Sequence, residues 1–293
     1  MIFKPDHTFV IAEAGINHNG SLDLAKKLVD AAAEAGCDAV KFQKRTPHMS
    51  LPPHLWNQER DTPWGVRMTY LAYRQKIELE SSDYYRIVEH CNNIGILFSA
   101  SPWDINAADT IFHVGAPFFK IASASVTNLE LVEHIANFKR PVVMSTGMCS
   151  KLDINKAVGL LEHHVSELAL LVCTSSYPAK PETLNLNRIR ALQEMFPEFV
   201  IGYSGHEPGL WTTLCAVAMG AKIVERHITL DRSMKGSDQS MSIEPAGFKK
   251  LVSEIRTFEK ARGSGDIHVL GCEKESIKRL RHTGPFNGAS QEA

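Results

Sequence analysis

Polar side chains with catalytic chemistry recur in this sequence at the ends of short apolar runs. The run FVIAEAG carries Glu13, AVKFQ carries Lys41 and Gln43, and FFKIAS carries Lys120. Ammonium groups beside hydroxyls can hold a compact ligand that bears phosphate and carboxylate, because they supply charge and hydrogen-bond donors with little bulk. The other polar residues at such run ends include Ser99, Ser101, Ser123, Ser125, Ser145, Thr146, Thr174, Ser175, Ser176, Tyr177, Ser204 and Glu225, and Asp238 and Gln239 follow the last run.

Two histidines, His206 and His227, stand at the ends of the last two runs. A pair of imidazoles on adjacent strands could share a divalent metal, although substrate or water must then complete the coordination sphere. From the residues alone, a hydrogen-bonded structural role is an equal alternative. A second alternative concerns Lys41 and Lys120, since either could form a Schiff base, as lysines do in many barrel aldolases.

The elements that must position these residues alternate between short apolar runs and segments of helical period. The runs are apolar throughout, which is typical of parallel strands covered on both faces. They span residues 9–15, 39–43, 96–100, 118–123, 142–146, 168–174, 199–204 and 222–227. Each is followed by a predicted helix: the first covers residues 21–36, with Ser21 as its cap and Gly36 at its end, and the others begin near Ser82, Ile105, Asn128, Asp153, Asn187, Trp211 and Pro245.

Eight strand–helix units predict an α/β fold, either an open doubly wound sheet or a closed barrel. Three features favour a (β/α)8 TIM barrel as a single domain over residues 1–265. They are the count of eight units, a size of about 250 residues and the absence of a G-x-G-x-x-G after the first strand. Barrel enzymes place their catalytic groups at the carboxyl ends of the strands. Residues 46–80 form an unusually long connection, which indicates a functional loop or a surface Ω-loop packed on its own aromatics. Residues 266–293 are expected to form a flexible C-terminal tail.

Composition excludes several classes of protein. The 293 residues carry 32 Lys and Arg against 33 Asp and Glu, so no overall field attracts nucleic acid or a membrane. The six cysteines are scattered without a C-x-x-C pair, which is typical of reduced thiols. There is no signal-peptide core and no apolar stretch of membrane-spanning length. We therefore expect a cytoplasmic protein with no nucleic-acid or membrane partner.

Seven phrases in register resemble the sialic acid synthase family over roughly residues 8–262. They are IAEAGINHNG (11–20), VKFQ (40–43), FFKIAS (118–123), STGM (145–148), CTSSYP (173–178), YSGHEPG (203–209) and ERHITLDRSMKGSDQSMSIEP (225–245). The resemblance implies a transferase that joins phosphoenolpyruvate to N-acetylmannosamine or a related aldehyde sugar and releases phosphate. It implies a divalent metal as well, Mn2+ by preference, with Mg2+ and Co2+ as alternatives.

The resemblance also assigns roles to residues. The phosphoenolpyruvate cradle would consist of Lys41, Lys120, Ser101, Ser123, Ser145, Ser175 and Ser204. The metal ligands would be His206 and His227, and the groups that meet the acceptor sugar would be Glu13, Gln43, Tyr177 and Asp238. Among the latter, Glu13 is the candidate for proton transfer at the sugar oxygen. The resemblance thus favours metal-assisted condensation over a Schiff base.

Two departures from the family concern the acceptor. Family members usually carry a carboxylate where this chain has Ser125. Most also continue into a small antifreeze-like domain that reaches across a homodimer, and this chain stops about where that domain would begin. We therefore expect an intact half-reaction with phosphoenolpyruvate and an acceptor that differs from N-acetylmannosamine. A barrel aldolase or lyase with a lysine imine, and a non-catalytic sugar-phosphate binding protein, remain the alternative functions.

Overall fold

A computed structural model of the protein describes residues 2–4 and 6–282, and its central feature is a ring of eight parallel strands. In chain order they are β1 (Phe9–Gly15), β2 (Ala39–Lys44), β5 (Leu97–Pro102), β6 (Phe119–Ile121), β7 (Val142–Ser145), β8 (Leu168–Cys173), β9 (Val200–Gly205) and β10 (Ile223–His227). The hydrogen-bonded order is β5-β2-β1-β10-β9-β8-β7-β6, so β1 pairs with β10 and the sheet curls round on itself. The predicted barrel is confirmed.

The ring is closed between β5 and β6 by a side chain. Among the described residues no backbone ladder joins these two strands, which lie at the two ends of the sheet order. The Ser99 hydroxyl of β5 instead donates a 2.7 Å hydrogen bond to the carbonyl oxygen of Phe118, the residue before β6. We call this junction the β5–β6 seam.

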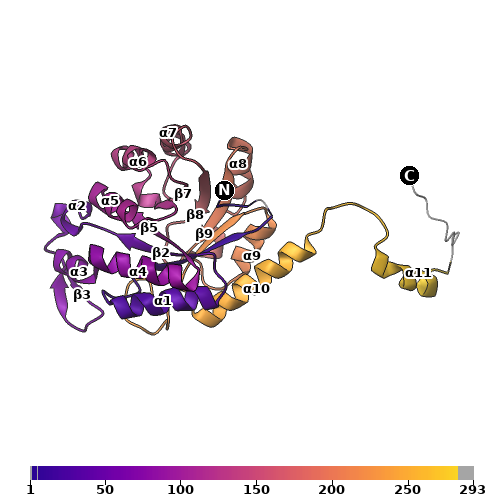
Figure 1. Ribbon diagram of the computed structural model, residues 1–293, viewed down its shortest axis with the longest axis horizontal. Coiled ribbons are helices and arrows are strands. Elements are labelled where there is room, and N and C mark those ends of the chain that lie inside the picture. The colour runs from indigo at the N-terminus through magenta and orange to yellow at the C-terminus, as the bar shows by residue number, and fades with distance from the viewer. Residues whose placement is uncertain (1, 5, 283–293) are drawn as a thin grey trace. The chain divides into compact units, whose positions relative to one another are not determined.

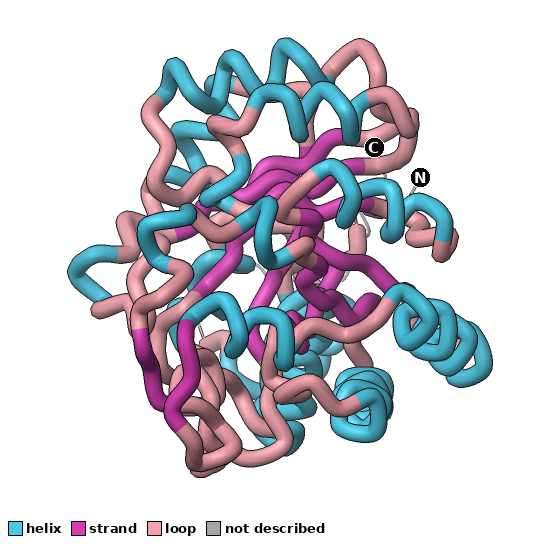
Figure 2. Tube along the Cα trace, turned by 90° about the vertical axis from the view of Figure 1, so that its left-hand side faces the viewer, coloured by secondary structure: helices cyan, strands magenta, loops and turns pink. Residues whose placement is uncertain are grey.

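Helices enclose the strands, as the cyan tubes around the magenta ones in Figure 2 show. They are α1 (Leu22–Glu34), α4 (Ser81–Ile94), α5 (Ile105–His113), α6 (Leu129–Ala136), α7 (Lys151–Leu161), α8 (Arg188–Met195), α9 (Trp211–Ala218) and α10 (Pro245–Ala261). The first shows how the sequence sets the boundaries: the Ser21 hydroxyl accepts a hydrogen bond from Leu24 N, as a helix cap should. Gly36 follows the helix with a φ of +82°.

The barrel interior is layered because side chains along a strand alternate between its two faces. On β1, Phe9 and Ile11 belong to a buried apolar cluster that also contains Phe118 and Ile223. The next inward residue of β1 is Glu13, so charge begins one layer above this apolar floor. The outward residues pack against the helices in a second, larger core.

Residues 46–80 form short elements of their own (Figure 1). These are α2 (Pro47–Ser50), a 3-10 turn (Pro53–Leu55), the antiparallel hairpin of β3 (Glu59–Asp61) and β4 (Arg67–Thr69), and α3 (Tyr70–Ile77). Their aromatic side chains pack together, with the rings of Trp64 and Tyr73 6.1 Å apart, and Tyr73 belongs to a small buried apolar cluster that includes Ile16. The segment is therefore built partly on its own aromatics, as one of the two predictions for it requires.

The described residues from 260 to 282 belong to a second compact unit of the chain. Its described part contains a 3-10 turn (Gly271–Glu273) and α11 (Lys274–Leu280). The predicted tail, residues 266–293, extends into residues 283–293, which lie outside the described residues. In the part of the chain that is described, no helix is both long enough and apolar enough to cross a membrane.

The tight packing between β9 and its neighbours gives a first prediction. A Cβ on Gly202 would lie 2.5 Å from the Ile223 carbonyl oxygen and 2.5 Å from Leu171 Cδ2. We expect Gly202→Ala to lower the free energy of unfolding by about 1–3 kcal/mol through overpacking. Chemical denaturation measures this.

A matched control is Gly159→Ala in α7, where the added methyl group meets nothing within 4 Å. It should raise stability by about 0.5–1 kcal/mol, because alanine is the better helix former. Equal effects of the two substitutions would contradict the packing of β9 described above.

Candidate active site

The carboxyl ends of the strands surround a cavity of about 240 Å³. Because parallel strands end at the same side of a barrel, side chains far apart in the sequence meet there. Twelve of the thirteen predicted site residues line it: Glu13, Lys41, Gln43, Ser101, Lys120, Ser123, Ser145, Tyr177, Ser204, His206, His227 and Asp238. Ser175 does not line the cavity, and its hydroxyl lies 3.9 Å from the Cys173 sulfur.

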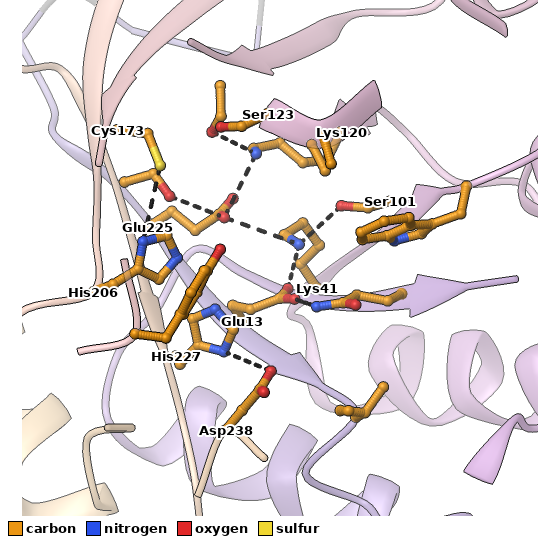
Figure 3. Close-up of a pocket in the computed structure, with 18 of the residues that line it drawn as sticks. Glu13, Lys41, Ser101, Lys120, Ser123, Cys173, His206, Glu225, His227 and Asp238 are labelled. Carbon is orange, nitrogen blue, oxygen red and sulfur yellow. Dashed lines mark hydrogen bonds and ion pairs between the residues drawn. The ribbon is translucent and has the colours of Figure 1, made fainter. Parts of the chain in front are cut away.

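At the base of the cavity four buried charges alternate in sign (Figure 3). Lys41 Nζ contacts Glu13 Oε2 and lies 3.9 Å from Glu225 Oε1, while Lys120 Nζ lies 3.6 Å from the same Glu225 oxygen. We call these four residues the charge chain. Each ammonium also donates a hydrogen bond to a serine hydroxyl. Lys41 donates to Ser101 Oγ at 3.0 Å, and Lys120 donates to Ser145 Oγ at 2.7 Å.

The two carboxyl groups of the charge chain differ in acidity. Burial raises the pKa of Glu13, and the nearby Glu225 adds to this rise, which Lys41 only partly offsets. Burial also acts on Glu225, but Lys120 and Lys41 outweigh it and lower the pKa of this carboxyl. Burial lowers the pKa of the Lys120 ammonium as well. Of the two carboxyl groups, Glu13 is therefore the one suited to carry a proton, while Glu225 stays ionised.

The two histidines lie side by side, with ring centroids 5.3 Å apart. His206 Nδ1 donates to the Thr174 carbonyl oxygen at 3.1 Å, which leaves the lone pair on Nε2. Burial lowers the pKa of His227 to about 4, so its ring is neutral at pH 7. His227 Nδ1 is buried without a hydrogen-bond partner, and its nearest carboxylate oxygen, on Asp238, is 3.6 Å away.

Imidazole nitrogens with a free lone pair are suitable ligands for a divalent transition metal. An outer hydrogen bond like that from His206 to Thr174 is the usual support of a metal-bound histidine. Within the described residues, no cluster of three or more His, Cys, Asp or Glu forms a complete metal site. The donor set thus fits a metal whose remaining positions are open to substrate or water.

A fully buried ion pair between Arg226 and Glu207 lies next to both histidines in the sequence. Arg226 precedes His227 and Glu207 follows His206. Arg226 Nη1 donates to Glu207 Oε1 at 3.1 Å and to the Thr213 hydroxyl at 2.6 Å, and both charged side chains are 1% exposed. Since β9 and β10 are also paired, the ion pair fixes the two histidine-bearing segments against each other.

Removing one partner of this ion pair leaves an uncompensated buried charge. We expect Arg226→Leu to lower the free energy of unfolding by about 3–5 kcal/mol. The double variant Arg226→Leu with Glu207→Leu should lose much less than the sum of the two single losses, because no lone charge remains. Urea denaturation of the three variants tests this, and additive losses would contradict a coupled pair.

Several residues of the cavity were not in the predicted set. Glu225 stands at a predicted strand end but was not assigned a role, although its position two residues before His227 puts both on the inner face of β10. The remaining additions are Ile16, Arg45, Arg74, Trp103, Ala122, Ala124, Met148, Cys173 and Ser237. Arg74 comes from the 46–80 segment. Ser125, singled out as a departure, is buried and does not line the cavity, whereas Ser123 and Ala124 do.

Comparison with known proteins agrees with this geometry. A family model described as the NeuB family matches residues 28–267. N-acetylneuraminate-9-phosphate synthase of Homo sapiens is 37% identical over 272 residues, which cover 93% of this chain and 76% of that protein. N,N'-diacetyllegionaminic acid synthase of Campylobacter jejuni is 35% identical, with 94% and 83% covered.

A solved structure extends the likeness to three dimensions. The crystal structure of N-acetylneuraminic acid synthetase from Leptospira borgpetersenii, in complex with citrate, superposes with a TM-score of 0.82 at 33% identity. The match covers 94% of this chain and 93% of that one.

Proposed function

Because the chain belongs to the NeuB family, we propose that it condenses phosphoenolpyruvate with an N-acetylmannosamine-type aldehyde sugar and water, giving a nonulosonic acid and phosphate. It acts as a transferase at the mouth of the barrel. The observation that carries the proposal is the pair of buried ammonium groups, Lys41 and Lys120, that share Glu225 and each contact a serine hydroxyl.

Phosphoenolpyruvate fits this base of the cavity by charge. Its phosphate and carboxylate can pair with the two ammonium groups, which the charge chain already holds in place. The hydroxyls of Ser101 and Ser145 accept hydrogen bonds from the lysines and still have a proton to donate to the ligand. Ser123 and Ser204 add further hydroxyls to the lining of the cavity.

The histidine pair supplies the second part of the proposal. His206 and His227 would hold a divalent metal, Mn2+ by preference, with Mg2+ and Co2+ as alternatives. Such a metal supplies Lewis acidity toward the aldehyde oxygen of the sugar. Gln43, Tyr177 and Asp238 line the same cavity and would orient the acceptor.

The residues of the charge chain then serve the steps of the reaction. The methylene carbon of phosphoenolpyruvate forms a bond to the aldehyde carbon, and the aldehyde oxygen takes a proton that Glu13 can supply. Water adds to the electron-poor C2 and gives one proton to Glu13, which restores it. The tetrahedral intermediate then collapses to a ketone as its C–O bond to phosphate breaks and its hydroxyl proton leaves with the phosphate. Lys41 and Lys120 stabilise the negative charge of the departing phosphate.

Removal of a metal ligand tests the role of the histidines. Loss of a residue that only supports a metal ligand typically lowers activity by about 10–100-fold. We expect His206→Ala or His227→Ala, which remove a ligand itself, to lower metal-dependent turnover by more than that. EDTA should abolish the activity of the wild-type protein. Phosphate release and calorimetric Mn2+ binding measure the two effects.

The control is His134→Ala on α6, since His134 binds Asp109 away from the cavity. It should keep both turnover and metal binding. Full activity of the EDTA-treated wild type would contradict the metal-assisted reaction.

Isotope labelling separates this reaction from the lysine-imine alternative. With 18O at the bridging oxygen of phosphoenolpyruvate, C–O cleavage puts the label in the released phosphate, which mass spectrometry detects. Borohydride in the presence of substrate should label no lysine. Label retained in the sugar acid, or a trapped Lys41 or Lys120, would overturn the proposal. A protein that binds phosphoenolpyruvate yet releases no phosphate would be the non-catalytic alternative.

A further inference from the structure

The outer part of the cavity carries two arginines that the reaction above does not use. Arg45 follows β2 and Arg74 lies in α3, and both line the cavity. Arg45 is 6% exposed. Asp238 is the carboxylate that lines the cavity on this side, and its Oδ2 lies 3.6 Å from His227.

The position of Arg45 follows from the alternation along β2. Lys41, Gln43 and Arg45 are spaced two residues apart, so they share the inner face and rise toward the mouth in steps of roughly 6–7 Å. Arg45 Nη2 donates to Gln43 Oε1 at 2.5 Å, which confirms their adjacency. The lysine of the charge chain is thus deepest, and the arginine is nearest the mouth.

Both guanidinium groups have unused donors. Arg45 Nη1 is buried without a hydrogen-bond partner, and its nearest carboxylate oxygen, Glu78 Oε1, is 3.8 Å away. Arg74 Nη2 donates to the Tyr70 hydroxyl at 3.0 Å, whereas its Nη1 is buried and unpartnered. Among the described residues, Arg74 forms no salt bridge. Its charge contributes, after burial, to lowering the pKa of Arg45 to about 10.

Such an arrangement is costly unless an anion completes it, because buried charged donors without partners lose their hydration without compensation. Neighbouring side chains hold the guanidinium of Arg45 in place, since it stacks 4.0 Å from the Trp103 ring. Two arginines from separate elements can approach a tetrahedral phosphate from two sides, as arginines commonly do.

We propose that Arg45 and Arg74 bind a phosphate ester at the end of the acceptor sugar farthest from its aldehyde. The inference rests on the proposed function, because the aldehyde must meet phosphoenolpyruvate near Lys41. The opposite end of an open-chain sugar then extends toward the mouth, where the two arginines lie. The protein thus discriminates among acceptors by charge at this end.

The test compares N-acetylmannosamine, its 6-phosphate and its 6-carboxylate, N-acetylmannosaminuronate, as acceptors. We expect the wild-type kcat/KM to be about 10- to 100-fold higher for the phosphate than for the uncharged sugar, as hydrogen bonds between charged groups allow. Arg74→Met and Arg45→Met should each lower the ratio of kcat/KM for the phosphate to kcat/KM for the uncharged sugar, mainly by raising KM for the phosphate. Arg74→Lys should restore part of this preference.

The matched control is Arg60→Met. Arg60 lies in the same segment and stacks 4.3 Å from the Tyr70 ring, but it does not line the cavity. It should keep the wild-type preference, which separates lost phosphate binding from a disturbed segment. A wild-type preference for the uncharged sugar, or one that survives both arginine substitutions, would overturn the inference. A kcat/KM for the 6-carboxylate equal to that for the 6-phosphate would overturn the choice of phosphate as the bound group.

Calorimetry distinguishes failure of the inference from failure of the proposed function. Phosphoenolpyruvate should bind the wild type and both arginine variants with Kd values within about 2-fold, because Lys41 and Lys120 hold it. If it does not bind the wild type, the proposed function is wrong. If phosphoenolpyruvate binds but no acceptor turns over, the 6-phosphate is titrated into the protein saturated with phosphoenolpyruvate. Equal binding of the 6-phosphate to the wild type and to Arg74→Met then overturns the inference.

Discussion

The charge chain inside the barrel is the interaction on which the site depends. Four ionisable groups are buried together inside the ring, and each would be strongly destabilising alone. They are tolerated because each carboxylate faces an ammonium, with Glu225 between the two lysines. The four groups lie on four different strands, β1, β2, β6 and β10, so the site exists only once the ring has formed. Folding and assembly of the site are therefore one event.

The same constraint explains what could be predicted from the sequence. All eight strands and the eight helices that follow them lie where the apolar runs and helical periods predicted them, because burial on both faces leaves a strong signal. Strand ends then gave the lining residues, since every parallel strand ends at one face. Glu225 was underestimated for a physical reason: its role depends on lying between Lys41 and Lys120, which are distant in sequence and adjacent only in the closed ring.

Residues outside the strands were harder to predict. Arg74 and Trp103 line the cavity from a helix and a loop whose course no strand period determines. Ser175 was expected at the cavity because it follows β8, but it does not line the cavity although Cys173 and Tyr177 do, because its position after the strand end is set by the loop and not by strand adjacency. The secondary structure of residues 46–80 likewise escaped prediction, because its elements are short and their aromatic contacts are formed within the segment.

The β5–β6 seam gives the barrel a mechanical asymmetry. Seven junctions between strands are backbone ladders, whereas among the described residues this one is held by the Ser99 hydroxyl. The two halves of the proposed phosphoenolpyruvate cradle lie on opposite sides of it: Lys41 and Ser101 on β2 and β5, Lys120 and Ser145 on β6 and β7. A ligand held by both lysines would bridge the β5–β6 seam. Substrate binding would then connect the two strands that no backbone ladder joins in the described part of the chain, and its binding free energy would add to the free energy of unfolding.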